Sequence, residues 1–292
     1  MNFPTTRLPA KTFLIGEYAA LQGLPAILLT TRPYFTLSLK QKPGLQGIHP
    51  DSPAGRFWLS QGLAAGLCFE DPYHGLGGMG ASSAQFLGAY QLYSHVTQQP
   101  FTREGLLTSY EIAAWDRTGQ RPSGYDVIAQ SLSGCVQVDR NHSIFRAFPW
   151  PFKSLSFMLV HTQVKCETHT HLKTLPDTLP DLTELGQLSE KALKAFQTTH
   201  EPTLIEALQD YHAALQRYGW VTDTSLQLCQ TLLTYPGVRA AKGCGAMGSD
   251  VLVLLVDRDK IDSVGQLILQ AGLLILAVDE GVFSQNPVVN VP

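Results

Sequence analysis

The chain has 292 residues, about twice the usual length of a single domain, so we expect two domains or one large one. Hydrophobic residues make up 44% of it and charged residues only 15%, which excludes disorder as its main state. Because the net charge is −3, no global positive field is available to hold a nucleic-acid backbone, and nucleic acid is not an expected partner.

The cysteines and the apolar runs indicate a cytoplasmic protein. The five cysteines are odd in number and widely spaced, with no CxxC pair, which favours a reducing compartment over a disulfide framework or a zinc site. The densest apolar runs, 251–256 and 273–278, fall short of the ~18 residues of a membrane span. The apolar stretch 13–15 is too short for the core of a signal peptide. We therefore expect no membrane association.

The first half of the chain is predicted to begin with strands and to continue with helices. Residues 12–39 contain short apolar stretches rich in Ile, Leu, Thr, Phe and Tyr, broken by Gly23 and Pro25, as is typical of strands joined by turns. Apolar spacing and β-like composition predict four further elements: a helix from Ser83, a helix over 103–116, and strands over 135–139 and 144–148.

The segment Pro149-Trp150-Pro151 predicts a turn and a domain boundary, because each proline fixes φ and lacks a donor. We place an N-terminal domain at 1–150 and a C-terminal domain at 151–292. The elements predicted beyond the boundary are a strand over 155–161, helices over 182–198, 203–218 and 223–233, a glycine loop, a strand over 251–256, a helix, and a strand over 273–278. Strands that alternate with helices in both halves indicate α+β or α/β layers.

The central glycine-rich segment, 75–84, leads directly into the helix predicted from Ser83. Backbone N–H groups of such a turn, together with the positive dipole end of the helix it opens, form an anion site. Ser82 and Ser83 add hydroxyls at the predicted N-cap, where they cap the helix or ligate Mg²⁺ beside a phosphate. We interpret the segment as a phosphate-binding turn; the alternative is a serine-capped helix after a flexible loop.

Common phosphate-binding folds fit this segment poorly. Gly75, Gly77 and Gly80 form a G-x-G-x-x-G, but no hydrophobic strand immediately precedes it and no acid follows about 20 residues later, as a dinucleotide fingerprint requires. The sequence also contains no G-x-x-x-x-G-K-[ST] and neither the H-R-D nor the D-F-G of a protein kinase.

Three further motifs accompany the central one. Residues 9–18 place a lysine, Lys11, before a strand that ends in Gly-Glu, and residues 242–250 form a glycine turn before the strand at 251. Between them, residues 122–127 form a turn that presents the carboxylate of Asp126 where a helix begins. Taken alone, Lys11 also fits a solvated strand-edge lysine and Asp126 also fits a helix N-cap.

The four motifs together resemble those of the GHMP small-molecule kinases, which include galactokinase, homoserine kinase, mevalonate kinase and phosphomevalonate kinase. In that family the motifs are similar to P-G-K-x-x-L-x-G-E, G-x-G-L-G-S-S-A, a P-S-G-x-D turn and K-x-x-G-A-G-G-G, and here they occur in the same order over nearly the whole chain. The resemblance implies an α+β, two-domain fold, with an N-terminal βα domain that binds ATP and a C-terminal ferredoxin-like α/β sandwich.

Finer details resemble the phosphomevalonate branch: Gly16-Glu17-Tyr18, the segment 123–127, and Asp250 at the end of the third glycine motif. The segment 162–168 is loosely similar to a Thr-Gly-Lys…Thr segment of that branch, with Gln163 in place of the glycine. The chain departs from the family at Ala10, at Met79-Gly80 and at Met247, and the acid that helps to hold Mg²⁺ is unassigned between Glu111 and Asp116.

The resemblance implies a role for each motif in an ATP- and Mg²⁺-dependent phosphoryl transfer. Lys11 would sit at the transferring phosphoryl group and pair with Asp126. Ser82 and Ser83 would hold the phosphates, and Ser82 would also hold the metal. The implied cofactor-binding residues are Gly77, Gly78, Gly80, Ala81, Ser82 and Ser83. The implied substrate-binding residues are Glu17, Tyr18, Ser123, Gly124, Lys165, His169, Gly245, Ala246 and Gly248.

Two groups of residues keep alternative interpretations. The segment 166–171 carries ligand-type side chains, with His169 and His171 on one face of a strand, which fits either a metal site or ordinary surface histidines. The resemblance to the phosphomevalonate branch implies a third role, in which His169 and Lys165 bind an anionic acceptor. Arg239 and Lys242 form a second basic pair, either solvated or in contact with phosphate.

The sequence therefore predicts a kinase that phosphorylates a small anionic metabolite of the mevalonate pathway, first of all phosphomevalonate. Mevalonate kinase is the nearest alternative, and a kinase-like protein that binds nucleotide or metabolite without turnover is an alternative of another class. The expected partner is a small-molecule substrate, and the expected state is a monomer or homodimer.

Overall fold

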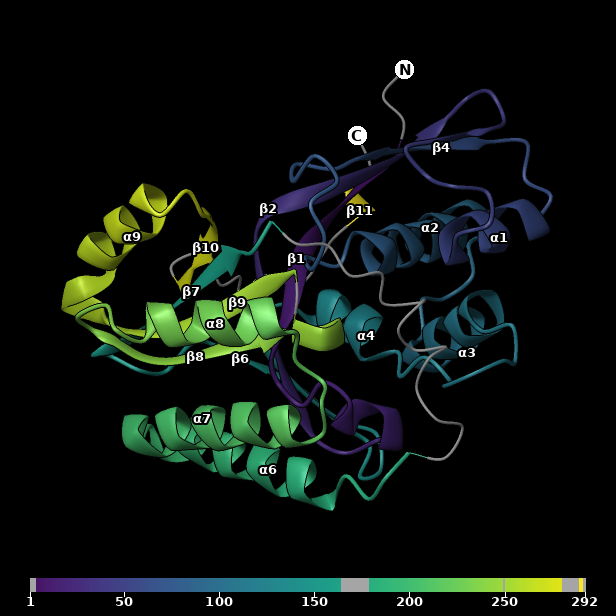
Figure 1. The fold of residues 1–292 in the computed structure, drawn as a ribbon. Coiled ribbons are helices and arrows are strands. Elements are labelled where there is room, and N and C mark those ends of the chain that lie inside the picture. Colours follow the sequence, from purple (N-terminus) through teal and green to yellow (C-terminus); the bar gives the residue numbers. More distant parts are fainter. Residues whose placement is uncertain (1–3, 164–178, 249, 280–288, 291–292) are drawn as a thin grey trace.

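The computed structural model describes residues 4–163, 179–248, 250–279 and 289–290, and these residues form two sheets with helices around them (Figure 1). Sheet A has seven strands: β11 (Val289–Asn290), β1 (Thr5–Ile15), β2 (Ala26–Lys40), β4 (Gly66–Glu70) and β3 (Leu45–Gln46) in that order, with β5 (Cys135–Asp139) paired to β2 and β6 (Ile144–Phe148) paired to β5. Sheet B has four strands in the order β10 (Leu274–Val278), β7 (Leu155–His161), β9 (Val251–Asp257) and β8 (Val238–Cys244).

Strands β1 and β2 form the antiparallel pair that carries the first motif. Gly16 ends β1 at a φ of 102°, and a Cβ there would come within 2.5 Å of the backbone of Ala26, so only glycine permits the turn. The turn includes the short 3₁₀ segment η1 (Ala19–Gln22) before β2 begins. Most of β1 is buried, because sheet A is covered on one face by helices and on the other by the C-terminal half.

The N-terminal helices lie together on one side of the molecule (Figure 1): α1 (Pro53–Ser60), α2 (Ala81–Thr97), α3 (Arg103–Ala114) and α4 (Tyr125–Leu132). Helix α2 is the central one, and ten of its seventeen residues are buried. At Gly88 a Cβ would come within 2.8 Å of the side chains of Leu8 and Leu37, so the missing side chain lets α2 approach sheet A closely. Helix α2 is thereby held rigidly against β1.

Sheet B is covered by helices on both faces. The helices α6 (Thr183–Thr198) and α7 (Glu201–Arg217) lie side by side in Figure 1. They pack against one face of sheet B, the face from which Phe157 of β7 projects. The helices α8 (Asp223–Leu232) and α9 (Ile261–Gln270) pack against the opposite face of sheet B, from which Met158 of β7 projects. Within the described residues, no helix is long and apolar enough to cross a membrane.

The two halves share a core and are joined at two places. One continuous cluster of buried residues contains side chains from sheet A, sheet B, α2 and α7. Strand β11, which follows all of sheet B in the sequence, pairs with β1 of sheet A. A boundary near residue 150 remains a prediction, because the chain returns to the first sheet at its other end.

Most predicted elements are confirmed, and three have the predicted bounds: β5, β6 and β7. The sequence prediction omitted α1, whose N-cap Ser52 accepts a hydrogen bond from the Gly55 N–H at 3.1 Å, and it omitted β3, β4 and β11. The predicted glycine loop from Lys242 is wrong at its start, since Lys242, Gly243 and Cys244 lie in β8.

Candidate functional site

The first motif, the central glycine segment and α4 are joined by hydrogen bonds. The Lys11 N–H donates to the Met79 carbonyl at 3.0 Å. The side-chain amide of the buried residue Gln130, on α4, donates to the Pro9 carbonyl at 2.7 Å and to the Gly80 carbonyl at 3.2 Å. The structure thus brings together three segments that lie up to 121 residues apart in the sequence.

Lys11 and Asp126 form an ion pair, with Nζ 2.9 Å from Oδ1. The Lys11 side chain is 10% exposed and that of Asp126 is 33% exposed, so the pair lies at the edge of the interior with its carboxylate reaching solvent. Asp126 lies in the first turn of α4, where the helix dipole stabilises a negative charge, and Gly124 occupies the N-cap at a φ of 75°. Asp126 is therefore placed to orient the Lys11 ammonium, and its interpretation as an N-cap is wrong.

The turn that precedes α2 is held by Asp71. Its two carboxylate oxygens accept hydrogen bonds from the backbone N–H groups of Tyr73 and Gly75, both at 2.8 Å. Gly80, at a φ of 81°, occupies the N-cap of α2, and the Lys11 side chain passes beside it. The first backbone N–H groups of α2 have no acceptors within the helix, so the arrangement offers donors to an anion.

The two serines differ in their surroundings. Ser83 is buried and its hydroxyl donates to the Gly80 carbonyl at 3.0 Å, whereas Ser82 is exposed. Both lie inside α2, so the prediction that they form the N-cap is wrong by two residues for Ser82 and by three for Ser83. Of the two hydroxyls, that of Ser82 is the one positioned to reach a ligand.

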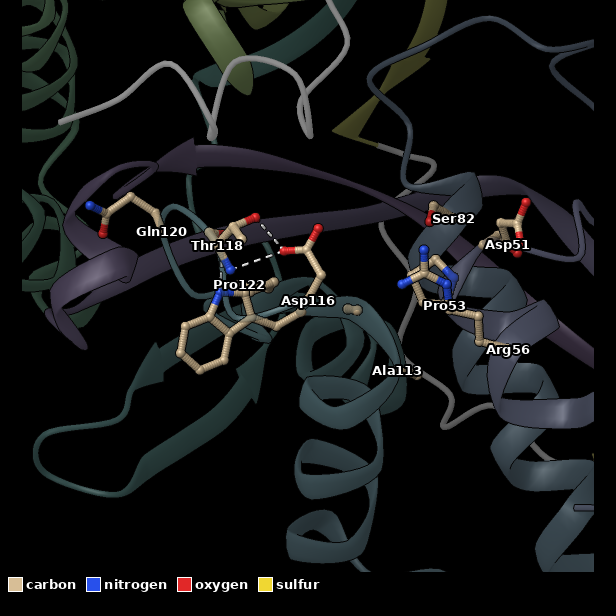
Figure 2. Close-up of a pocket in the computed structure, with 12 residues that line it drawn as sticks. Asp51, Pro53, Arg56, Ser82, Ala113, Asp116, Thr118, Gln120 and Pro122 are labelled. Carbon is tan, nitrogen blue, oxygen red and sulfur yellow. Dashed lines mark hydrogen bonds between the residues drawn. The ribbon is translucent and has the colours of Figure 1, made fainter. Parts of the chain in front are cut away.

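Ser82 also lines a pocket of about 270 Å³ between α1 and the segment that follows α3 (Figure 2). In Figure 2 it lies on the same side as Asp51 and Arg56, opposite Thr118 and Gln120. Asp116 lines the pocket too, and its Oδ1 accepts hydrogen bonds from the Thr118 N–H at 3.0 Å and hydroxyl at 2.6 Å. Of the lining residues, Ser82 and Pro122 belong to the sequence motifs, and Asp116 was one of the two acids weighed for Mg²⁺.

The other weighed acid, Glu111, forms an ion pair with Arg121 and does not line the pocket. A hydroxyl and a carboxylate, those of Ser82 and Asp116, therefore line one pocket beside the N-terminus of α2. Oxygen ligands of this kind are the ones that Mg²⁺ prefers.

The third motif covers the central glycine segment from the side of sheet B. A Cβ at Gly77 would lie 2.8 Å from a carboxylate oxygen of Asp250, and one at Gly78 would lie 2.5 Å from Cγ2 of Val251. Met247, at a φ of 54°, lies in the short 3₁₀ segment η2 (Ala246–Gly248), and its N–H donates to the Tyr18 hydroxyl at 3.0 Å. The first and third motifs are thus in direct contact.

A buried ion pair makes a second link between these motifs. Nζ of Lys242 donates to Oε1 of Glu17 and, at 2.8 Å, to the Gly243 carbonyl, while the Tyr211 hydroxyl donates to the Glu17 carbonyl. The side chains are 0% and 4% exposed, and burial raises the pKa of Glu17. Lys242 is therefore neither solvated nor in contact with an external phosphate, whereas Arg239 is exposed, 3.8 Å from Asp257.

The departures from the expected motifs are largely accommodated in the core. Ala10 is fully buried in β1 and the Met79 side chain is 1% exposed, so neither projects into the pocket.

Ser123, a predicted substrate-binding residue, makes two hydrogen bonds: its hydroxyl accepts one from the Tyr125 N–H at 3.4 Å, and its carbonyl accepts one from the Arg140 side chain. Lys165 and His169, like Cys166 and His171, lie outside the described residues.

Gly78→Ala is expected to destabilise the protein more than Gly75→Ala. Both glycines have a positive φ, 81° and 85°, so each alanine costs about 1–2 kcal/mol in backbone conformation. A Cβ at Gly75 has no atom within 4 Å, whereas one at Gly78 clashes with the rigid, buried Val251. The difference in urea-unfolding free energy between the two variants measures the clash; equal losses would show that the loop does not press against β9.

No protein-family model and no curated protein sequence matches the chain, but solved structures do. They include Streptococcus pneumoniae phosphomevalonate kinase in complex with phosphomevalonate and AMPPNP (13% identity, TM-score 0.77, 94% of this chain and 98% of that one). They also include L. major mevalonate kinase in complex with R-mevalonate (19%, 0.70, 94% and 98%) and Lactococcus lactis galactokinase complexed with galactose (13%, 0.74, 98% and 95%). The chain has the fold of these GHMP kinases, which confirms the predicted fold class.

Proposed function

We propose that the chain is an ATP- and Mg²⁺-dependent small-molecule kinase of the GHMP family. The strongest support is the Lys11–Asp126 pair, which lies beside Gly80 at the N-terminus of α2. A transferring phosphoryl group needs charge neutralisation and positioning more than covalent chemistry, and a lysine next to a set of backbone N–H donors supplies both. The pocket that begins at Ser82 has room beside these groups for part of a nucleotide.

Each group of residues in the site has its own role in the proposed phosphoryl transfer. The backbone N–H groups of the loop and of α2 bind the phosphates, with the Ser82 hydroxyl beside them. Ser82 and Asp116 would hold Mg²⁺, which neutralises phosphate charge when bound. Lys11, oriented by Asp126, stabilises charge on the phosphoryl group in the transition state.

The acceptor we propose is phosphomevalonate, an anionic metabolite of the mevalonate pathway. The support comes from the motif details around Tyr18, Ser123 and Asp250 and from the fold shared with a phosphomevalonate kinase. A phosphomonoester with a second pKa near ~6 is already ionised at pH 7, so it needs no strong base, which suits an Asp126 engaged by Lys11.

A coupled ADP-release assay with phosphomevalonate, mevalonate, galactose and homoserine in parallel tests the proposal. We expect ADP release that depends on phosphomevalonate. Turnover of mevalonate alone would identify the alternative acceptor. Tight nucleotide binding without turnover of any acceptor would overturn the kinase proposal and favour the binding-protein alternative, for which the left-handed Met247 in the third loop is the motivating observation.

Ser82→Ala is expected to raise the KM for ATP by about 10-fold or more, because it removes the exposed hydroxyl beside the phosphates and the metal. Ser83→Ala is the matched control: it removes a buried hydrogen bond to Gly80 and is expected to cost about 1 kcal/mol of stability with a smaller effect on KM. Steady-state kinetics and urea unfolding of both variants measure the difference. A larger KM effect at Ser83 would reverse the assignment.

A further inference from the structure

His161 is a buried histidine at the end of β7 that is only 4% exposed. The backbone N–H of Gln163 donates to its Nδ1 at 2.9 Å. Burial lowers the pKa of His161, so the ring is neutral at pH 7. Because Nδ1 accepts a hydrogen bond in a neutral ring, the proton is on Nε2, and Nε2 is a donor. Among the described residues, no acceptor partners it.

His161 lies next to the central glycine segment. It is directly opposite Val251 in the β7–β9 ladder, so the two side chains project from the same face of sheet B. Val251 is the residue whose Cγ2 contacts Gly78. The next residue, Thr162, donates its N–H to the Asp250 carbonyl at 3.0 Å, and the Asp250 carboxylate lies against Gly77. The unpartnered donor is therefore held in the layer of side chains where sheet B meets the glycine segment.

The two sides of the glycine segment are formed by different halves of the chain. The pocket at Ser82 is lined by residues between Asp51 and Pro122 only, all of them from the N-terminal half. The opposite side is formed by β9 and its neighbour β7 in sheet B. A nucleotide in the pocket would occupy the first side, and His161 lies on the other.

We propose that the Nε2–H of His161 donates a hydrogen bond to an anionic oxygen of the phosphoryl acceptor, a carboxylate or phosphate oxygen. This inference rests on the proposed kinase function and deepens it by assigning an acceptor-binding residue. A buried donor without a partner destabilises the free protein, and a bound anionic oxygen removes that cost.

The kinetic test compares His161→Leu, which removes the donor, with His161→Gln, whose amide restores one. With phosphomevalonate as the probe, we expect His161→Leu to raise the KM for the acceptor about 10-fold or more and to change the KM for ATP less than twofold. We expect His161→Gln to recover most of the loss. His212→Leu on α7 is the matched control, because its Nδ1 is also buried without a partner among the described residues, and it is expected to leave the acceptor KM unchanged.

Three results would each overturn the inference: an equal rise of the acceptor KM in His161→Leu and His161→Gln, a change in the KM for ATP alone, or no change in either KM. The last result would indicate that the Nε2–H binds only a structural water. If wild-type protein releases no ADP with any acceptor, the proposed function has failed, and the inference is then decided by ¹H–¹⁵N NMR of the ring Nε2–H. We expect phosphomevalonate alone to shift that resonance. A shift with ADP alone, or none with either ligand, would overturn the inference.

Discussion

Lys11→Met is expected to lower kcat by about 10²–10³-fold while the protein stays folded. Methionine preserves most of the volume of the lysine side chain, and the Asp126 side chain it leaves behind is 33% exposed, although its Oδ1 is buried. The lost charge stabilises the transition state more than the ground state, so the KM for ATP should change far less than kcat. The coupled ADP assay measures both constants, and a circular dichroism melt of each variant checks the fold.

The companion variant, Asp126→Asn, separates the two acceptors. With an alcohol acceptor, Asp126 would act as general base and its loss should cost about 10²–10⁴-fold in kcat. With a phosphomonoester that is already ionised, the loss should be less than about 10-fold. An Asp126→Asn effect as large as that of Lys11→Met on phosphomevalonate turnover would contradict the proposed division of roles.

Lys242→Met is expected to destabilise the protein by about 3–5 kcal/mol, because it leaves Glu17 buried without a counter-ion. Burial already raises the pKa of Glu17, and loss of the ammonium raises it further, so the folded state holds a proton more tightly than the unfolded state does. Stability of this variant is therefore highest at low pH and falls as the pH rises above the pKa of the unfolded state. Urea unfolding at pH 5 and pH 8 measures the difference.

The double variant Glu17→Leu/Lys242→Met is the control for that loss. Replacing both charges by apolar groups of similar size is often neutral or stabilising, so the double variant should recover most of the free energy of unfolding lost in Lys242→Met. Glu17→Leu alone should remain destabilised, because it leaves the Lys242 ammonium buried without a counter-ion. If the double variant is no more stable than Lys242→Met, the destabilisation arises from packing of the side chains and not from an unpaired charge.

Periodic apolar patterns predicted most of the helices and strands, and the missed elements are explained by their length, their composition or a strand partner distant in the sequence. Strands β5 and β7 were predicted at their bounds because their β-branched and aromatic runs are flanked by turn residues. Helix α1 was missed because it is short and begins in a segment rich in Ser, Pro and Gly. Strand β8 contains Ala and Gly, which are poor strand formers, and it is a strand because β9 supplies a partner.

Motifs predicted which segments would form the candidate site, but not how their side chains pair. Lys11 and Asp126 were predicted to pair, and they do. The pair between Glu17 and Lys242 spans 225 residues, and no pattern in a single sequence indicates such a partner. The pocket lining combines α1, Ser82 and the segment after α3, which share no motif. His161 was missed because its unpartnered nitrogen becomes visible only when its neighbours are placed.

The return of β11 to β1 has a consequence for how the chain folds. A fragment cut at residue 150 would lack the strand that covers one edge of β1, the strand on which Lys11 lies. It would also expose the apolar residues that it shares with sheet B and α7 in the common core. Neither fragment is therefore expected to be an autonomous folding unit, and the halves should fold and unfold as a single cooperative unit.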